Sequence, residues 1–165
     1  MKLLLFPLTF LSFNLFSGNT IFSDDLDEFT DEREIFIAVV GDEHNSILSE
    51  FIGIYCDTEN EPRMVLKKGI VISLKSYLSV TFRFDKNKPI TKDFRVNNSN
   101  NLLFTQDIYF INSFLYELRN SNDLIAKIED ESEIMRHTDL NNSEKHVTEF
   151  MNAASEMPSS TCNLF

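Results

Sequence analysis

Hydrophobic and polar residues alternate most regularly between Tyr77 and Asp85. The apolar side of this segment consists of Leu78, Val80, Phe82 and Phe84. The residues between them are mostly polar, so the two sides of an extended backbone differ in character. A period of two is typical of a strand with one face in the core and the other in solvent. The segment therefore predicts a half-buried β-strand, and Asn87 and Pro89 after it indicate a turn.

Apolar or alternating segments elsewhere in the chain predict further short strands. They cover residues 34–40, 51–56, 63–66, 69–74, 90–96, 102–105, 124–128 and 134–138. The segment 34–40 is almost continuously apolar and rich in β-branched residues, which is typical of a strand covered on both faces. Gly53, within the next predicted strand, indicates a bulge or the close approach of another group.

Helical spacing replaces the alternation in two places. Between residues 107 and 119 the apolar residues recur every three or four positions, and Phe110 and Phe114 widen the stripe, so we expect a helix with aromatic side chains in the core. Asn141, three residues before Glu144, has the form of an N-cap, and helical spacing continues from there to Pro158. These elements predict a mainly β fold: an antiparallel β-sandwich of about seven or eight strands with one or two peripheral helices.

The N-terminal segment has the layout of a secretory signal peptide. Lys2 precedes an apolar run from Leu3 to Phe16, and small residues follow. The run is about 14 residues long, whereas a membrane-spanning helix needs about 20, so cleavage is favoured over a retained anchor. Ser17 and Ser23 both offer cleavage positions. We expect a signal peptide over residues 1–23, one domain over residues 24–165, and a periplasmic or secreted mature protein without a membrane span.

The chain is strongly acidic, with a formal net charge of −11 at pH 7. Such a chain repels phosphate groups, so neither nucleic acid nor an anionic membrane surface is an expected partner. The acidic residues gather in two runs, within residues 24–34 and 129–133. Solvated surfaces explain most runs of this kind, and docking to a basic partner is the alternative.

Two cysteines, Cys56 and Cys162, follow the expected signal peptide. In an oxidising compartment an isolated pair is favoured to form a disulfide, which would tie the C-terminal tail to an early strand. Two reduced and unconnected thiols are the alternative.

The sequence contains few signatures of catalysis. Its four glycines form neither a phosphate-binding loop nor a nucleophile elbow. One group of possible metal ligands consists of Asp42, Glu43, His44 and, farther along the chain, His137. A solvated loop is the simpler explanation of that group. Asp57, Glu59 and Glu61 alternate as calcium ligands do, but their loop lacks the glycine that such a loop needs. No cofactor is therefore expected.

The polar side of the strand around residues 77–85 is a candidate binding face. Arg83 and Asp85 are two residues apart and point the same way, so they could form a surface ion pair that contributes little to stability. The alternative is that Tyr77, Arg83 and Asp85 together contact a protein partner.

Several residues occur in an order that resembles a known family. An apolar strand ends in Cys56, and Tyr77, the run Phe82–Asp85 with its arginine between aromatic residues, Pro89 and finally Cys162 follow. This order resembles the type VI secretion-associated VasI/TagO family of small exported proteins. The resemblance covers about residues 34–162. It implies a periplasmic accessory protein with a β-sandwich fold, no known catalytic residues, and Cys56 close in space to Cys162.

Two classes of function follow from these observations. The first is an exported, non-enzymatic accessory or binding protein with a protein partner in the cell envelope. A phage-derived protein that protects the envelope is another possibility outside secretion loci. The second class is a secreted metal-dependent hydrolase built on Asp42, Glu43 and His44, with His137 as a candidate fourth residue. The lack of a recognisable catalytic constellation in the sequence favours the first class.

Overall fold

The computed structural model describes residues 20–28, 32–41, 51–58, 61–67, 75–97, 102–129, 133–157 and 162–164, without the side chains of residues 133–137. Its elements are β1 (Thr20–Leu26), β2 (Arg33–Val40), β3 (Phe51–Asp57), β4 (Arg63–Lys67), β5 (Tyr77–Phe84), β6 (Ile90–Val96), β7 (Leu102–Thr105), α1 (Ile108–Asn120), β8 (Asp123–Ile128), β9 (Glu133–Asp139) and α2 (Ser143–Glu156). The predicted mainly β class with two helices is confirmed. Of the predicted strands, only residues 69–74 lie outside the described part of the chain.

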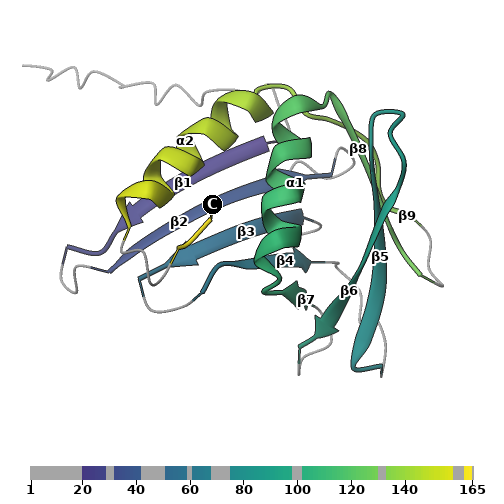
Figure 1. Ribbon diagram of the computed structural model, residues 1–165, viewed down its shortest axis with the longest axis horizontal. Helices are drawn as coiled ribbons and strands as arrows, with labels where there is room; N and C mark the ends of the chain where they lie inside the picture. The colour runs from purple at the N-terminus through teal and green to yellow at the C-terminus, as the bar shows by residue number, and fades with distance from the viewer. Residues whose placement is uncertain are drawn as a thin grey trace, which may run out of the picture.

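The described strands form one antiparallel sheet of nine, in the order β1-β2-β3-β4-β7-β6-β5-β8-β9. The sequence predicts seven or eight strands in a sandwich. A single sheet suffices because the two helices cover its apolar inner face, which a second sheet would otherwise have to bury (Figure 1). The β6–β7 pairing spans only two residue pairs, Arg95 with Phe104 and Val96 with Leu103. Strands on the two sides of this short junction run in clearly different directions (Figure 1).

We call β1, β2, β3, β4 and β7 the first half of the sheet, and β5, β6, β8 and β9 the second half. In the second half, β5 has the alternation that its sequence predicts: Leu78, Val80, Phe82 and Phe84 are buried. Helix α1 packs on this face. The Phe114 ring lies edge-on to Phe82 and Phe84, with ring centroids 5.4 and 5.2 Å apart. The prediction that Phe114 belongs to the core is confirmed, and Phe110 is partly buried against the same cluster.

Asp107 caps the start of α1 and attaches the helix to β6. One carboxylate oxygen accepts a hydrogen bond from the Phe110 N–H at 3.1 Å, and the other is paired with the Lys92 ammonium group. The Lys92 bond, together with the bond from Phe110, lowers the pKa of the Asp107 carboxyl. Lys92 also lies 5.8 Å from the centre of the Phe110 ring. The same lysine therefore contacts both the cap and the first turn of α1.

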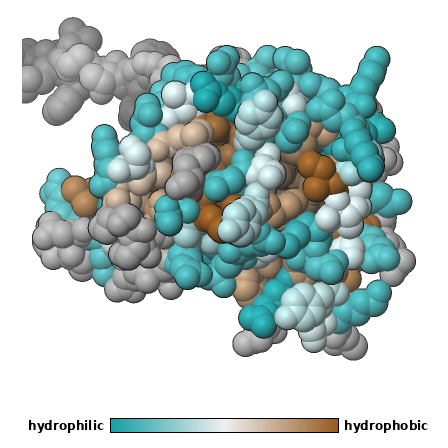
Figure 2. All heavy atoms as spheres, viewed as in Figure 1, coloured by the Kyte–Doolittle hydropathy of each residue, from teal (hydrophilic) through white to brown (hydrophobic). Residues whose placement is uncertain are grey.

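Helix α2 and the C-terminal segment 162–164 lie over the inner face of the first half (Figure 1). Val147 and Phe150 of α2 are fully buried in the core that also contains Ile35 and Ile37 of β2. Hydrophobic side chains are visible between α1 and α2 in Figure 2, and hydrophilic residues surround them. Neither described helix is long and apolar enough to cross a membrane.

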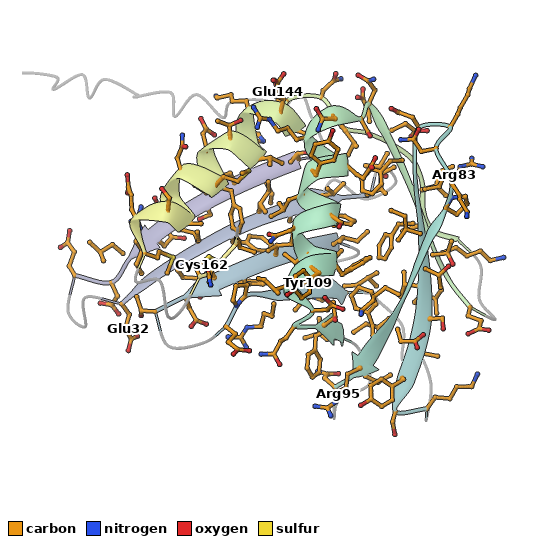
Figure 3. All side chains as sticks on the ribbon, viewed as in Figure 1. Glu32, Arg83, Arg95, Tyr109, Glu144 and Cys162 are labelled. Atoms are coloured by element: carbon orange, nitrogen blue, oxygen red, sulfur yellow. A yellow bond between two sulfur atoms is a disulfide. The ribbon has the colours of Figure 1, made fainter. Side chains whose placement is uncertain are left out.

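A disulfide joins Cys162 to Cys56 of β3, with the two Cα atoms 5.5 Å apart (Figure 3). The expected pairing of these two cysteines is confirmed. The bridge closes a loop of 106 residues. In the chain-entropy model, closing a loop of this length stabilises the folded state by about 4–5 kcal/mol. The bridge holds the C-terminal segment against the inner face, where Leu164 is buried.

The start of α2 differs from the predicted N-cap. Asn142, not Asn141, is the capping residue, and it has a φ of 67° with no side-chain cap bond. The Asn141 side chain instead donates a hydrogen bond to Asp139 at the end of β9. The turn follows β9 directly, so this local bond competes with the capping arrangement that the spacing to Glu144 suggests.

Strand β1 includes residues that the expected signal peptide 1–23 would remove. Thr20 to Leu26 pair along their whole length with β2, from Thr20 opposite Val39 to Leu26 opposite Arg33. Thr20 is 1% exposed, and the Phe22 ring packs edge-on against Phe150 of α2 at 6.4 Å. The boundary between residues 23 and 24 therefore lies inside a paired strand. Cleavage after Ser17 would leave β1 intact.

Candidate functional site

Asp85, one of the three candidate binding residues, stabilises a turn. Its backbone φ is 47°, a left-handed conformation that aspartate tolerates better than most residues. Its Oδ1 accepts hydrogen bonds from the backbone N–H groups of Asn122 at 3.0 Å and Asp123 at 2.9 Å. These bonds connect the end of β5 to the segment between α1 and β8. Among the described residues, the Asp85 carboxylate forms these bonds and no ion pair with Arg83.

Tyr77 and Arg83 lie near opposite ends of β5. Tyr77 is 54% exposed, and the guanidinium group of Arg95 on β6 lies 5.8 Å from its ring centre. The separation of Tyr77 and Arg83 along a strand corresponds to about 20 Å. Arg83 and Arg95 accordingly appear at opposite ends of the second half in Figure 3. Tyr77, Arg83 and Asp85 are thus spread along β5 and the turn that follows it, and they do not converge on one site.

Between these ends, side chains on the outer face of β5 and β6 bond to each other. The Ser79 hydroxyl donates to Asp93 at 2.6 Å, and the Thr81 and Thr91 hydroxyl oxygens are 2.9 Å apart. Cross-strand pairs of this kind stabilise a sheet. Their hydrogen-bonding capacity is partly used within the protein, which leaves less of it for a partner.

The predicted metal ligands are only partly within the described residues. Asp42, Glu43, His44 and Glu59 lie outside them, as does the side chain of His137. Asp57 is paired with Arg63, whose Nη2 is 2.6 Å from Oδ2 of Asp57. Within the described part of the chain, no group of three or more histidine, cysteine, aspartate or glutamate residues is arranged to hold a metal ion.

The outer face of the first half, opposite the helices, carries a second hydrophobic cluster. Its members are Ala38, Val40 and Phe51, which are buried, and Ile21, Phe36, Tyr55 and Val65, which are partly buried. The Phe36 ring stacks on Tyr55 with centroids 4.3 Å apart and lies edge-on to Phe51 at 5.9 Å. We call Phe36, Phe51, Tyr55 and Val65 the outer aromatic patch.

Strand register explains why this patch forms. Phe36 of β2 lies opposite Tyr55 of β3, and Val65 of β4 lies opposite Gly53. A Cβ atom on Gly53 would be 2.3 Å from Cε2 of Phe36 and 3.2 Å from Cε2 of Phe51. Gly53 therefore provides the space into which two of the aromatic rings pack. The predicted close approach of another group to this glycine is confirmed.

A hollow of about 300 Å³ lies beside the outer aromatic patch. It is lined by Glu34, Phe51, Tyr55, Asp57, Arg63, Val65 and Leu102. Burial of the ring and the nearby Glu34 carboxylate raise the pKa of Tyr55, while the positive charge of Arg63 acts in the opposite direction. The hollow combines aromatic walls with two carboxylates and one guanidinium group, so it can take a side chain that is partly apolar and partly charged.

A second hollow, of about 330 Å³, adjoins the first and shares Glu34 and Asp57 with it. Its lining residues are Asp25, Asp27, Glu32, Arg33, Glu34, Asp57 and Thr58. Glu32 marks this end of the first half in Figure 3. Arg33 is held by Asp24 at 2.7 Å and by Glu156 of α2 at 3.2 Å, and its bond to Asp24 lowers the pKa of that carboxyl. Carboxylates therefore dominate the surface next to the outer aromatic patch.

The sequence pattern did not indicate this site. Phe36 belongs to an apolar run that is typical of a strand covered on both faces, and Phe51 and Tyr55 belong to a second such strand. The outer cluster becomes recognisable once the two strands are paired in register. The available signal was Gly53, because a glycine inside a strand indicates that another group approaches the backbone closely.

Comparison of the chain with models of protein families, with curated proteins and with solved structures finds no match.

Proposed function

We propose that the protein is an exported, non-enzymatic accessory protein of the cell envelope, periplasmic or secreted, which binds a protein partner through the outer aromatic patch. The observation that carries the proposal is the patch itself. Aromatic residues cluster on the outer face of the sheet, opposite the two described helices, beside a hollow lined by both apolar and charged side chains.

The composition of this surface supports a protein partner. Protein interfaces are enriched in aromatic residues and arginine at their centres, and polar groups surround those centres. Phe36, Phe51 and Tyr55 supply the aromatic part, and Glu34 and Arg63 supply charged groups at its margin. The outer face of β5 and β6 offers less, because Ser79 and Asp93 already bond to each other.

Two features support export. The disulfide between Cys56 and Cys162 is of a kind that persists in oxidising compartments and is rare in reducing ones. The N-terminal sequence has the layout of a signal peptide. A role as an accessory of a type VI secretion system is the form of this function that the sequence resemblance implies.

Site-specific photo-crosslinking in the native host tests the binding function. A benzoylphenylalanine residue in place of Leu102, which lines the hollow, should crosslink to one defined envelope protein. The same residue in place of Lys127, which is exposed in the second half, is the matched control and should not capture that protein. Absence of a crosslink at residue 102, or equal crosslinking at both positions, would contradict the proposal.

The intact mass of the protein from the host tests export. The expected mass lacks residues 1–17 and two hydrogen atoms, because cleavage after Ser17 keeps β1 whole and the two cysteines are bridged. A full-length mass with two thiols that react with an alkylating agent would contradict export.

A further inference from the structure

The charge that lines the two hollows beside the outer aromatic patch is predominantly negative. Five carboxylate side chains line the two adjoining hollows: Asp25, Asp27, Glu32, Glu34 and Asp57. The two cations that line them, Arg33 and Arg63, are each paired with carboxylates of the protein. The chain as a whole carries a formal charge of −11. The potential at this surface therefore attracts a cation and repels an anion.

Arg63 shows which kind of group this environment accommodates. Its guanidinium group is 2.6 Å from Asp57, and in the sheet Arg63 lies directly opposite Tyr55. Guanidinium groups pair with carboxylates and stack on aromatic rings, and both kinds of partner are present here. Glu34, Phe51 and Leu102 also line the hollow, and its volume of about 300 Å³ leaves room for a further side chain.

The same charge argues against a second copy of this chain as the occupant. A two-fold symmetric contact through the outer aromatic patch would bring the acidic surface around Glu34 and Asp57 of one copy against the same surface of the other. Like charges at an interface are unfavourable. A partner segment with positive charges has the complementary potential.

We infer that the hollow receives an arginine or lysine side chain from a basic segment of the partner, with an adjacent apolar residue of that segment on the outer aromatic patch. This inference rests on the proposed binding function and adds the chemistry of the segment that is bound. Glu34 and Asp57 attract the cation, and the rings of Tyr55 and Phe51 contact its aliphatic part and the neighbouring residue.

A short synthetic peptide tests this inference by isothermal titration calorimetry. The probe is an acetylated and amidated hexapeptide of alternating leucine and arginine. The matched probe has citrulline, a neutral isostere, at each arginine position. The arginine peptide should bind the disulfide-bonded protein in 50 mM NaCl and bind severalfold more weakly in 300 mM NaCl, because salt screens exposed charges. The citrulline peptide should bind at least about tenfold more weakly than the arginine peptide.

Two substitutions in the hollow should change the affinity in opposite directions. Glu34→Gln removes a negative charge and should weaken binding about two- to fivefold, as expected for an exposed ion pair. Arg63→Gln removes the positive charge beside Asp57 and should strengthen binding by a similar factor. Glu129→Gln, which removes an exposed carboxylate at the end of β8, is the control and should leave the affinity unchanged.

Several outcomes would overturn the inference. Equal binding of the two peptides would show that the positive charge is not recognised, and weaker binding by the Arg63→Gln variant would indicate that an anion is recognised. Absence of binding by the arginine peptide, or a dimer that forms through the patch, would also contradict it. If a partner crosslinks at residue 102 and Glu34→Gln does not change the crosslinking yield, the binding function would be supported. The inference that a basic segment is bound would then be contradicted. Circular dichroism of each variant separates these outcomes from loss of the fold.

Discussion

The side chains on the outer faces of the two halves of the sheet interact in different ways. In the second half, Ser79 bonds to Asp93 and Arg95 stacks on Tyr77, so polar side chains pair across β5 and β6. In the first half, Phe36 stacks on Tyr55 beside a hollow with charged margins. The inner faces resemble each other, because both bury apolar side chains against a helix.

This difference shows that an alternating strand and a strand that is apolar on both faces are used differently. The alternating strand β5 has a polar outer face whose groups interact with each other. Neither described helix covers the apolar outer face of β2 and β3, where Phe36 and Tyr55 are only partly buried. Apolar surface of this kind often marks an interaction site. The first half is therefore the better place to look for function, although the sequence motif directed attention to the second.

The largest expected effect concerns the inner face of the second half. Phe82→Ala should lower the free energy of unfolding by about 3–5 kcal/mol, because it leaves a cavity among the aromatic rings that pack against α1. Tyr109, on the same helix, is 84% exposed, so Tyr109→Ala should change the free energy of unfolding by less than about 0.5 kcal/mol. Urea unfolding measures both. Similar values for the two variants would mean that α1 is not packed on β5 as described.

Removal of the disulfide should affect the first half more than the second. The double variant Cys56→Ala and Cys162→Ala should lose about 2–5 kcal/mol in urea unfolding. Hydrogen exchange should show faster exchange in β2 and β3, which the C-terminal segment covers, than in β5. The reduced and alkylated wild-type protein is the control and should behave similarly. Equal acceleration in both halves would indicate that they unfold only together.

Gly53→Ala tests the packing of the outer aromatic patch. The new Cβ atom would be 2.3 Å from the Phe36 ring, so the ring has to move, and overpacking of this kind costs about 1–3 kcal/mol. Combining it with Phe36→Leu should restore part of the lost stability, which urea unfolding of the single and double variants would show. A Gly53→Ala variant as stable as the wild type would mean that Phe36 does not occupy this space.

Substitutions at Asp85 should reduce stability, whereas a substitution at Arg83 should not. Asp85→Ala should cost about 1–2 kcal/mol, because the N–H groups of Asn122 and Asp123 lose their acceptor at a left-handed residue. Asp85→Asn keeps an acceptor oxygen and should cost less, and Arg83→Ala should change stability by less than about 0.5 kcal/mol. Thermal unfolding measures the series. A larger loss for Arg83→Ala than for Asp85→Ala would contradict this assignment.

The smallest effect is electrostatic. Glu34→Gln should lower the pKa of Tyr55 toward its ordinary value, and Arg63→Gln should raise it further. Because the folded-state pKa is raised, the associated stability is present below about pH 10 and is lost as the pH rises through that pKa. A ¹³C NMR titration of the tyrosine ring carbons would measure the shifts. The Glu129→Gln variant should leave the pKa of Tyr55 unchanged. If it shifted that pKa as much as Glu34→Gln does, the effect could not be assigned to the nearby Glu34 carboxylate.

Much of the fold was predictable because its signals are local. The alternation in β5, the helical spacing in α1 and the apolar runs in β2 and β3 depend only on which side of each element is apolar. The start of α2 was predicted wrongly, since the competing bond between Asn141 and Asp139 depends on the turn after β9. Strand β1 was missed because an apolar leader and an acidic run conceal its short pattern.

Little of the candidate site was predictable. Tyr77, Arg83 and Asp85 are close in sequence, yet Asp85 stabilises the turn after β5, whereas Tyr77 lies beside Arg95 near the other end of that strand. The residues of the outer aromatic patch come from three strands and converge through the β2–β3–β4 register. A pattern along one strand carries no information about its neighbour, so the convergence could not be predicted from it.

The sequence by itself determined the antiparallel β class, most of the strands, the aromatic core stripe of α1, the acidic charge and the two cysteines available for a bridge. These properties depend on the chemistry of neighbouring residues. Only the tertiary structure decided that the described strands form one sheet, that Thr20 to Leu26 pair with β2, and that Phe51, Tyr55 and Glu34 line one hollow. Strand order and register depend on contacts between residues distant in sequence, and local alternation does not encode those contacts.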